Sequence, residues 1–167
     1  RTRGRRRAAL FGGVALAGAV AGGTAWAVTG PGVCEGGAER VATLWSAPRR
    51  AAAEQAFAGT KLPYAADAWA GAARGLDEYG GAWSAMYTEA CEATQLRGEQ
   101  SAELMDLRMT CLQYRLRDMD AVIGLFEGAD PQIVKRAGEA VSGLPDLAVC
   151  ADAEALRNGA LARRPSV

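Results

Sequence analysis

The longest periodic pattern of apolar residues lies between Ala65 and Leu96, in the middle of the chain. Apolar positions recur there at alternating intervals of three and four, which places them on one face of a helix. The pattern predicts a long helix that buries this face against other helices. Glycines interrupt it, and we expect a bend or a close contact between helices near Gly80. The face consists of Trp69, Ala72, Leu76, Tyr79, Trp83, Met86 and Ala90.

Two short helices are predicted ahead of this long one. The first ends near Trp45, where Ser46 and Pro48 mark a new start. Serine is a common cap at helix N-termini, and proline is tolerated in a first turn. The second helix ends at Gly59.

The pattern stays helical after the long helix. A second long helix follows Gly98, and a shorter one begins at Asp130 and Pro131 and ends before Pro145. A brief helical turn through Cys150 comes next, and the residues after it lose periodicity and are expected to end in a frayed tail. No segment alternates with period two, so no sheet is predicted. The second long helix presents Met105, Met109, Leu112, Leu116, Met119, Ile123 and Phe126.

An uncharged run of 23 residues, 8–30, precedes all of these helices and follows five arginines in the first seven positions. At about 1.5 Å per residue, a helix of that length spans about 30 Å of hydrocarbon, which predicts a transmembrane helix. Arginines resist translocation, so residues 1–7 are expected to stay in the cytoplasm. The residues that indicate this topology are Arg5, Arg6 and Arg7 at the inner interface and Trp26 near the outer one.

Other interpretations of this run stay open. Ala25, Trp26 and Ala27 have the small-x-small form of a signal-peptidase site, so the segment could be a secretion signal cleaved after Ala27. Paired arginines before an apolar run are also typical of twin-arginine export. A buried helix of a soluble protein is a further alternative. The run is longer than the apolar region of a usual signal peptide, which favours a retained membrane helix. Because the first residue is not methionine, we expect the natural chain to begin further upstream.

Charge is divided unevenly about the apolar run. All 19 acidic residues follow Gly30, whereas five of the 19 basic residues precede it. The part after the run therefore carries 14 basic residues and a net charge of −5. This mild acidity, without a basic stripe, argues against nucleic acid or anionic lipid as a partner of that part.

Four cysteines lie beyond the apolar run and none lies within it. An even number outside a membrane predicts two disulfides, with buried free thiols as the alternative. A zinc site is disfavoured, because the chain has no C-x-x-C pair and no histidine. Of the three pairings we favour Cys34 with Cys150, which bracket the domain, and Cys91 with Cys111, which lie on consecutive helices. The second of these pairs requires an asymmetric turn or a turn centred near Ser101.

Residues suited to acid–base or nucleophilic chemistry are scarce. There is no histidine, no G-x-S-x-G elbow and no glycine-rich phosphate loop. Carboxylates such as Asp77 and Asp120 fit solvated helix faces. We therefore expect neither catalysis nor a cofactor. Trp45, Trp69 and Trp83 could form an aromatic cage for a ligand, but their helical spacing favours a packed core.

The block of residues 90–112 is less ordinary. Arg108 lies three residues before Cys111 and beside apolar positions, which places a fixed cation next to the core. A buried arginine needs partners, and we expect an ion pair with Glu92 or Glu99. An arginine that lies along the surface is the alternative.

The order of these features resembles the region after the transmembrane helix in bacterial eukaryote-like serine/threonine protein kinases. The resemblance rests on VATLWSAPRRAAAEQAFAGTKLPYA, then ACEAT, RGEQS and DLRMTCL, and finally LAVC-AD, and it covers residues 4–157. In that family a cytoplasmic kinase domain is joined through one membrane span to an outer helical region, often followed by tetratricopeptide repeats. The kinase motifs are absent from this chain, and no complete repeat follows Gly159.

The sequence thus predicts an all-α fold, with one N-terminal transmembrane helix and an antiparallel bundle of about four to five helices linked by disulfides. The segments are an arginine-rich cytoplasmic stretch, a membrane span, a linker, the helical domain, and a tail or the start of a further region. They occupy residues 1–7, 8–30, 31–36, 37–157 and 158–167.

The resemblance implies a membrane-anchored, non-catalytic sensory or interaction region of a receptor-type kinase. It would lie in a bacterial inner membrane with its main domain in the periplasm, where the expected partner is a ligand or a protein of unknown identity. One rival interpretation is a protein-binding scaffold that extends a repeat superhelix, and another is a secreted helical protein. The apolar faces suit a monomeric bundle and a homodimer equally well.

Overall fold

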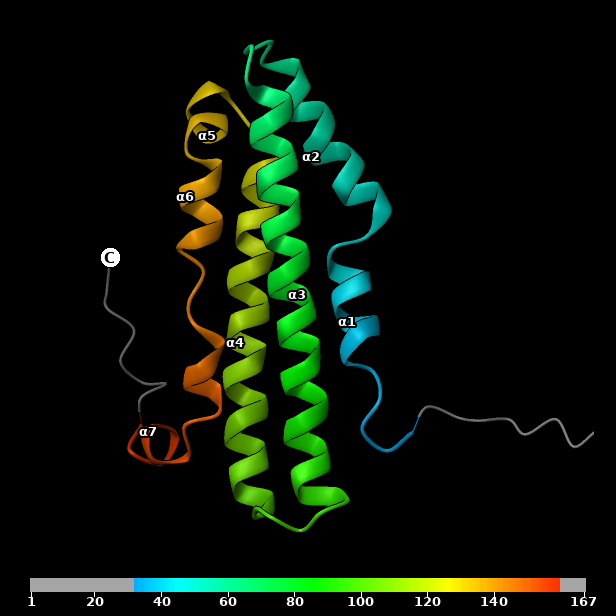
Figure 1. Cartoon of the computed structure of the whole chain (residues 1–167), viewed down its shortest axis with the longest axis vertical. Coiled ribbons are helices and arrows are strands. Elements are labelled where there is room, and N and C mark those ends of the chain that lie inside the picture. The colour runs from blue at the N-terminus through cyan, green and yellow to red at the C-terminus, as the bar shows by residue number, and fades with distance from the viewer. Residues whose placement is uncertain (1–31, 160–167) are drawn as a thin grey trace, which may run out of the picture.

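Two long antiparallel helices run through the centre of the molecule (Figure 1). The structure, a computed structural model, describes residues 32–159. The two helices are α3 (Ala65–Gln95) and α4 (Ala102–Glu127), and they confirm the two longest periodic patterns. The side-chain hydroxyl of Ser101 caps α4 by accepting a hydrogen bond from the Leu104 amide at 3.3 Å.

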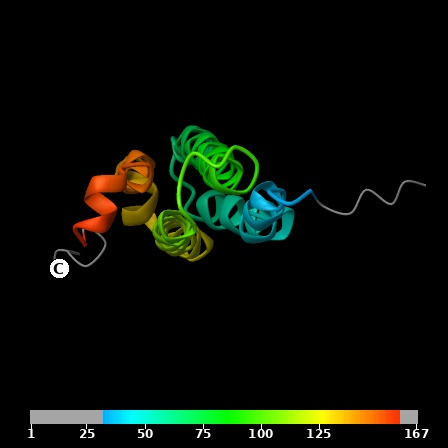
Figure 2. The same cartoon turned by 90° about the horizontal axis from the view of Figure 1, so that it is seen from below.

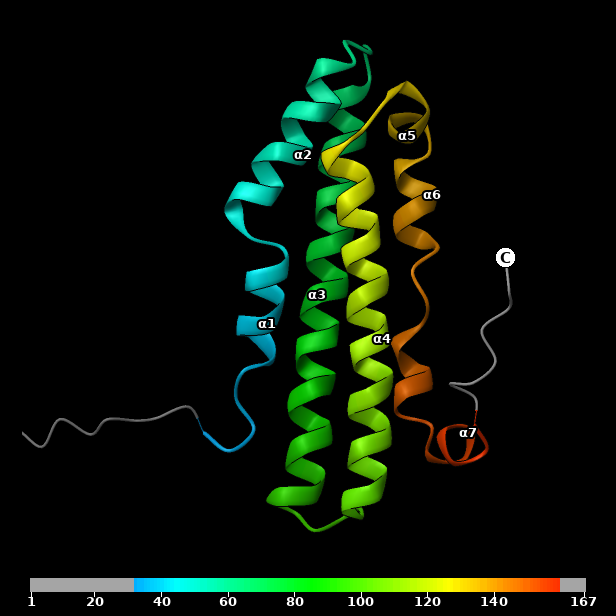
Figure 3. The same cartoon turned by 180° about the vertical axis from the view of Figure 1, so that it is seen from behind.

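The first two helices lie along one side of this pair, at the right in Figure 1. They are α1 (Gly37–Leu44) and α2 (Ala47–Gly59), and the break between them falls at the predicted place, with proline in the first turn of α2. Figures 1 and 3 show α2 slanting across the upper half of the pair, where it packs on both long helices, whereas α1 lies lower and packs on α3.

The chain after α4 returns along the other side of the pair in short elements. Seen from below in Figure 2, α3 and α4 stand between α1 on one side and α7 on the other. These elements are α5 (Pro131–Lys135), α6 (Ala137–Ser142), the 3₁₀ turn η1 (Leu147–Cys150) and α7 (Ala153–Arg157).

Two expectations for this returning segment are wrong in detail. Asp130 caps α5 as predicted, accepting hydrogen bonds from two following amides at 2.8 Å. The single helix expected after it is divided at Arg136, which lets α6 run back along α3. After Cys150 the sequence pattern indicated no regular structure, yet Asp152 caps α7 by accepting from two amides at 3.0 and 2.9 Å. Local side-chain capping, which the apolar pattern does not report, starts this helix.

Two hydrophobic cores lie one above the other along α3 and α4. In the upper core, Phe57 of α2 contacts Trp69 and Phe126, with ring centroids 5.4 and 5.3 Å away. The lower core surrounds Trp83, whose indole N–H donates to the Leu112 carbonyl at 2.7 Å. Both tryptophans are buried in these cores, as the packing interpretation predicts.

Glycines allow other helices to approach α3 closely. A Cβ on Gly80 would lie 2.7 Å from Cγ1 of Val41 in α1, and a Cβ on Gly75 would lie 2.6 Å from Cγ1 of Val141 in α6. Both distances are far too short for carbon atoms, so a larger residue at either crossing would force the valine or its helix to move. The close helix contact expected near Gly80 is therefore confirmed.

The all-α architecture is confirmed, and the described residues contain no strand. They form seven α-helices rather than four to five, because the layers on either side of α3 and α4 consist of short segments. The expected transmembrane helix, with Arg5, Arg6, Arg7 and Trp26, lies outside the described residues. Between residues 32 and 159, none of the helices combines the length and the apolar character that a membrane crossing needs.

Candidate functional site

All four cysteines form disulfides, but the pairing that we favoured is wrong. Cys34 is bonded to Cys91 and Cys111 to Cys150, with Cα atoms 5.4 and 5.5 Å apart. The favoured pairing required the two ends of the domain to meet. They instead lie on opposite sides of the α3–α4 pair, so each end is linked to the nearer long helix (Figure 2).

The two disulfides lie in different surroundings. Cys34 and Cys91 are 6% and 8% exposed and belong to neither hydrophobic core, and the backbone carbonyl of Val33 lies 3.5 Å from the Cys91 sulfur. Cys111 and Cys150 are 0% exposed and form part of the lower core. The first disulfide therefore holds a segment onto the surface of the bundle, and the second lies within the packing.

Arg108 is buried at the lower end of the bundle, as the sequence indicated, but its partners differ from those expected. Its guanidinium donates to the Cys150 carbonyl at 3.2 Å, to Oε1 of Gln100 at 3.0 Å and to the carboxylate of Glu89. The helices α3 and α4 reverse direction between residues 95 and 102, which places residue 108 opposite residue 89. Glu92 and Glu99 do not reach Arg108 and instead pair with the exposed Arg97, at 3.3 and 2.8 Å.

Gln100 completes this cluster and was missed from the sequence. Its amide nitrogen donates to the Ala90 carbonyl at 2.7 Å and to the Thr94 hydroxyl at 2.9 Å, while its oxygen accepts from Arg108. The Arg108 cluster thus joins the end of α3, the turn, α4 and η1. A short polar turn carries no hydrophobic period, so only the position of Gln100 in RGEQS, near a buried arginine, could have pointed to it.

A groove of about 710 Å³ lies between α1 and α4, below α2. Its volume lies within the range typical of ligand pockets. The groove lies open here because α1 packs mainly on α3, whereas α2 packs on both α3 and α4. The groove is lined by Glu35, Gly36, Glu39, Arg40, Thr43, Leu44, Arg49, Tyr87, Leu116 and Asp120.

An aromatic ring from α3 lies in the groove. Tyr87 stacks on Trp83 of the lower core, with ring centroids 5.4 Å apart. The guanidinium of Arg40, from α1, lies over the Tyr87 ring at 5.2 Å from its centroid. The Tyr87 ring therefore packs against the lower core and holds the Arg40 guanidinium at the wall of the groove.

Arg49 closes the upper end of the groove. Its guanidinium donates to Glu127 at 2.8 and 2.9 Å, to Asp120 at 2.7 Å and to the carbonyl of Leu44 at 3.1 Å. The hydrogen bond from Arg49 holds the pKa of Glu127 below its usual range. These contacts join α2 to α4 and fix the end of α1, so this end of the groove is preorganised.

Among the smaller hollows of the described residues, two lie away from the groove. One, of about 440 Å³, lies beside Phe126 and Ile133, and the other, of about 390 Å³, lies beside Phe57 and Trp69. Neither is lined by residues of the segment before α1. The groove is a better candidate site than these two hollows, because Glu35 and Gly36, which follow Cys34, line it.

Among residues 32–159 there is no group of three or more histidine, cysteine or acidic side chains arranged to hold a metal ion. No protein-family model, curated protein or solved structure matches the chain. The kinase-related family therefore stays a prediction that rests on the sequence blocks quoted above.

Proposed function

We propose that this chain is the membrane-anchored, extracytoplasmic sensory or interaction region of a receptor-type serine/threonine protein kinase. In this proposal the domain lies outside a bacterial inner membrane and performs no catalysis itself. A ligand or partner protein binds the groove between α1 and α4, and the membrane span carries the response to a catalytic domain in the cytoplasm.

The observation that carries the proposal is the use of all four cysteines in disulfides between separate elements. Disulfides of this structural kind persist in oxidising compartments and are rare in the cytoplasm. The uncharged run at residues 8–30, preceded by arginines, supplies a route of export that is consistent with this chemistry.

The location of the groove supports a sensory role. Glu35 and Gly36 line it immediately after Cys34, which is bonded to α3, while Leu116 and Asp120 line it from α4. A ligand in the groove would contact the segment that leads to the N-terminal region and a long helix of the bundle at once. Binding would therefore bias the position of that segment relative to the bundle.

Filling the groove tests this role. Thr43 is exposed and lines the groove, so Thr43→Trp should block binding without removing a core contact. Ala42 is exposed on the same helix but does not line the groove, so Ala42→Trp is the matched control. In a protein that carries the kinase domain, we expect Thr43→Trp to change autophosphorylation in cells at least threefold and Ala42→Trp to leave it unchanged. Equal autophosphorylation in wild type and both variants, across envelope conditions, would reject the groove as the sensory site.

A further inference from the structure

The segment before α1 is held on the bundle by a disulfide that belongs to neither hydrophobic core. Residues 32–36 have no helix, and their own hydrogen bonds close locally, from the Glu35 amide to the Gly32 carbonyl at 2.9 Å and from the Gly32 amide to the Glu35 carboxylate at 2.7 Å. We call these residues the N-terminal linker. The Cys34–Cys91 disulfide attaches this linker to α3, and the Val33 carbonyl oxygen lies beside the Cys91 sulfur.

The Cys111–Cys150 disulfide is held by much more than its own bond. It lies in the lower core with Leu147 and Leu156, and the Cys150 carbonyl accepts a hydrogen bond from Arg108. Separating these sulfurs requires η1 to leave the core and the Arg108 cluster. Separating Cys34 from Cys91 requires only the N-terminal linker to move, because neither cysteine belongs to a hydrophobic core.

We propose that Cys34–Cys91 is a reducible latch that fixes the N-terminal linker to α3, while Cys111–Cys150 is a permanent part of the fold. The sequence separations of the two disulfides, 57 and 39 residues, are similar, so loop closure alone does not distinguish them. The surroundings of the two disulfides do distinguish them. Cys34–Cys91 can be exposed by local opening of a peripheral segment, which costs far less free energy than opening the core around Cys111–Cys150. A role of this latch in regulating the sensor rests on the function proposed above.

The reductant that opens the latch is a dithiol. One of its thiolates attacks a latch sulfur, which breaks the S–S bond, forms a mixed disulfide and releases the other cysteine as a thiolate that takes up a proton. The second thiol of the reductant then attacks the mixed disulfide. The protein gains two electrons and two protons and holds two thiols, and the reductant leaves as its own disulfide.

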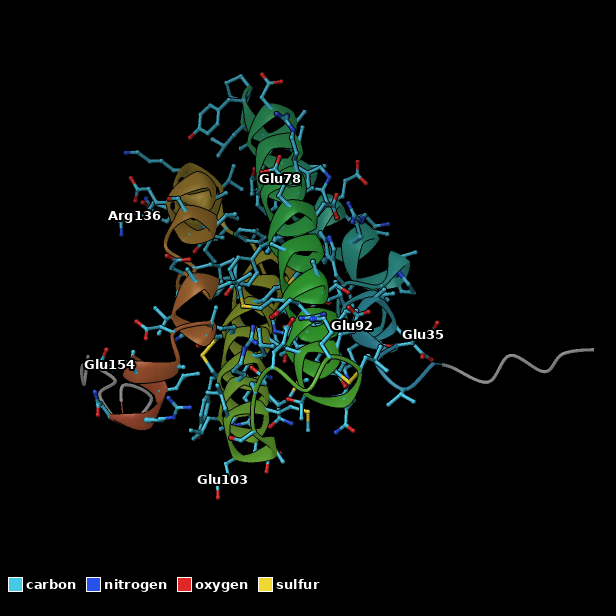
Figure 4. All side chains as sticks on the ribbon, turned by 60° about the horizontal axis from the view of Figure 1, so that its bottom comes forward. Glu35, Glu78, Glu92, Glu103, Arg136 and Glu154 are labelled. Carbon is cyan, nitrogen blue, oxygen red and sulfur yellow. A yellow bond between two sulfur atoms is a disulfide. The ribbon has the colours of Figure 1, made fainter. Side chains whose placement is uncertain are left out.

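Opening the latch changes the groove without dismantling the bundle. Glu35 and Gly36 line the groove and lose their attachment to α3. The helix α1 stays in place, because Val41 packs against Gly80 and Gly37 packs against Ser84 and Tyr87. Figure 4 shows Glu35 and Glu92, the neighbours of the two latch cysteines, on the same side of the molecule. The latch therefore lies beside the lower end of the groove.

Graded reduction of the whole 167-residue chain tests the latch. The oxidised protein is incubated with increasing dithiothreitol, trapped by alkylation, and each cysteine is quantified by mass spectrometry. We expect Cys34 and Cys91 to be half reduced at a dithiol concentration at least tenfold lower than Cys111 and Cys150. Equal midpoints, or earlier reduction of the core pair, would overturn the proposal.

A variant provides a second measurement. In Cys34→Ser/Cys91→Ser, amide hydrogen exchange should rise in residues 32–40 and stay unchanged in residues 104–123. Loss of protection across residues 104–123 would show that the first disulfide belongs to the folding core, and would also overturn the latch. The effect of Thr43→Trp on signalling does not depend on cysteine chemistry, so a failed latch and a failed sensory role give different results.

Discussion

Arg108 joins three elements at the lower end of the bundle. It is a permanent cation with 7% of its side chain exposed, and its partners come from the end of α3, the turn and η1. A planar guanidinium can donate in three directions at once, whereas a lysine ammonium at the end of a flexible chain cannot reach the same three acceptors. The type of residue, and not the charge alone, is therefore specified here.

Replacing Arg108 by lysine tests this geometric role. Arg108→Lys keeps the charge but leaves the Cys150 carbonyl or the Gln100 oxygen without its donor, which we expect to lower the free energy of unfolding by about 1–3 kcal/mol. Arg97→Lys is the matched control, because Arg97 lies at the same turn and pairs with the exposed carboxylates of Glu89, Glu92 and Glu99. Glu89 is shared with Arg108, but lysine keeps the charge that faces it, so the effect should stay below about 0.5 kcal/mol. Urea denaturation followed by circular dichroism measures both, and equal effects would show that the cluster contributes no more than surface charge.

Adjacent glycines in α3 illustrate how the helices are fitted together. Gly80 faces Val41 of α1, whereas a Cβ on Gly81 would meet nothing within 4 Å. Gly80→Ala should cost about 1–3 kcal/mol of stability, since the stiff valine side chain or α1 itself must move. Gly81→Ala should raise stability by about 0.5–1 kcal/mol, because alanine favours an exposed helix position. Thermal or urea unfolding distinguishes these opposite signs, and two changes of the same sign would contradict the observed packing of α1 on α3.

The sequence predicted a helix wherever the spacing of its apolar residues repeats over several turns. The patterns of α3 and α4 extend over many turns, and the break before α2 has a capping serine and a proline. The break at Arg136 and the start of α7 could not be found in this way, because they depend on the direction of α6 and on a cap at Asp152. Buried Arg108 followed from its spacing, but Glu89 did not, because its partner position depends on where the turn between α3 and α4 is centred.

The disulfide pairing depends on how all the helices are arranged in the molecule, so it could not be predicted from the pattern of any one segment. The linker arrives beside the end of α3 because α1 runs antiparallel to it, and η1 returns beside α4, so each terminal segment is joined to the long helix that it lies against (Figure 1). The groove arises at the same scale. It exists because α2 packs on both long helices while α1 packs mainly on α3, and the apolar pattern of a single helix does not indicate such an arrangement.

The proposed function requires the domain to lie outside the cytoplasm, and thiol labelling in living cells determines its compartment. The 167-residue chain is expressed in a bacterium, treated with a membrane-impermeant maleimide with and without prior reduction, and analysed in membrane and soluble fractions. We expect a membrane-bound chain in which no cysteine is labelled before reduction, because all four are paired in an oxidising compartment. After mild reduction we expect label on Cys34 and Cys91. A chain whose cysteines are free, and are labelled without reductant only after the cells are lysed, would place the domain in the cytoplasm and contradict the proposed function.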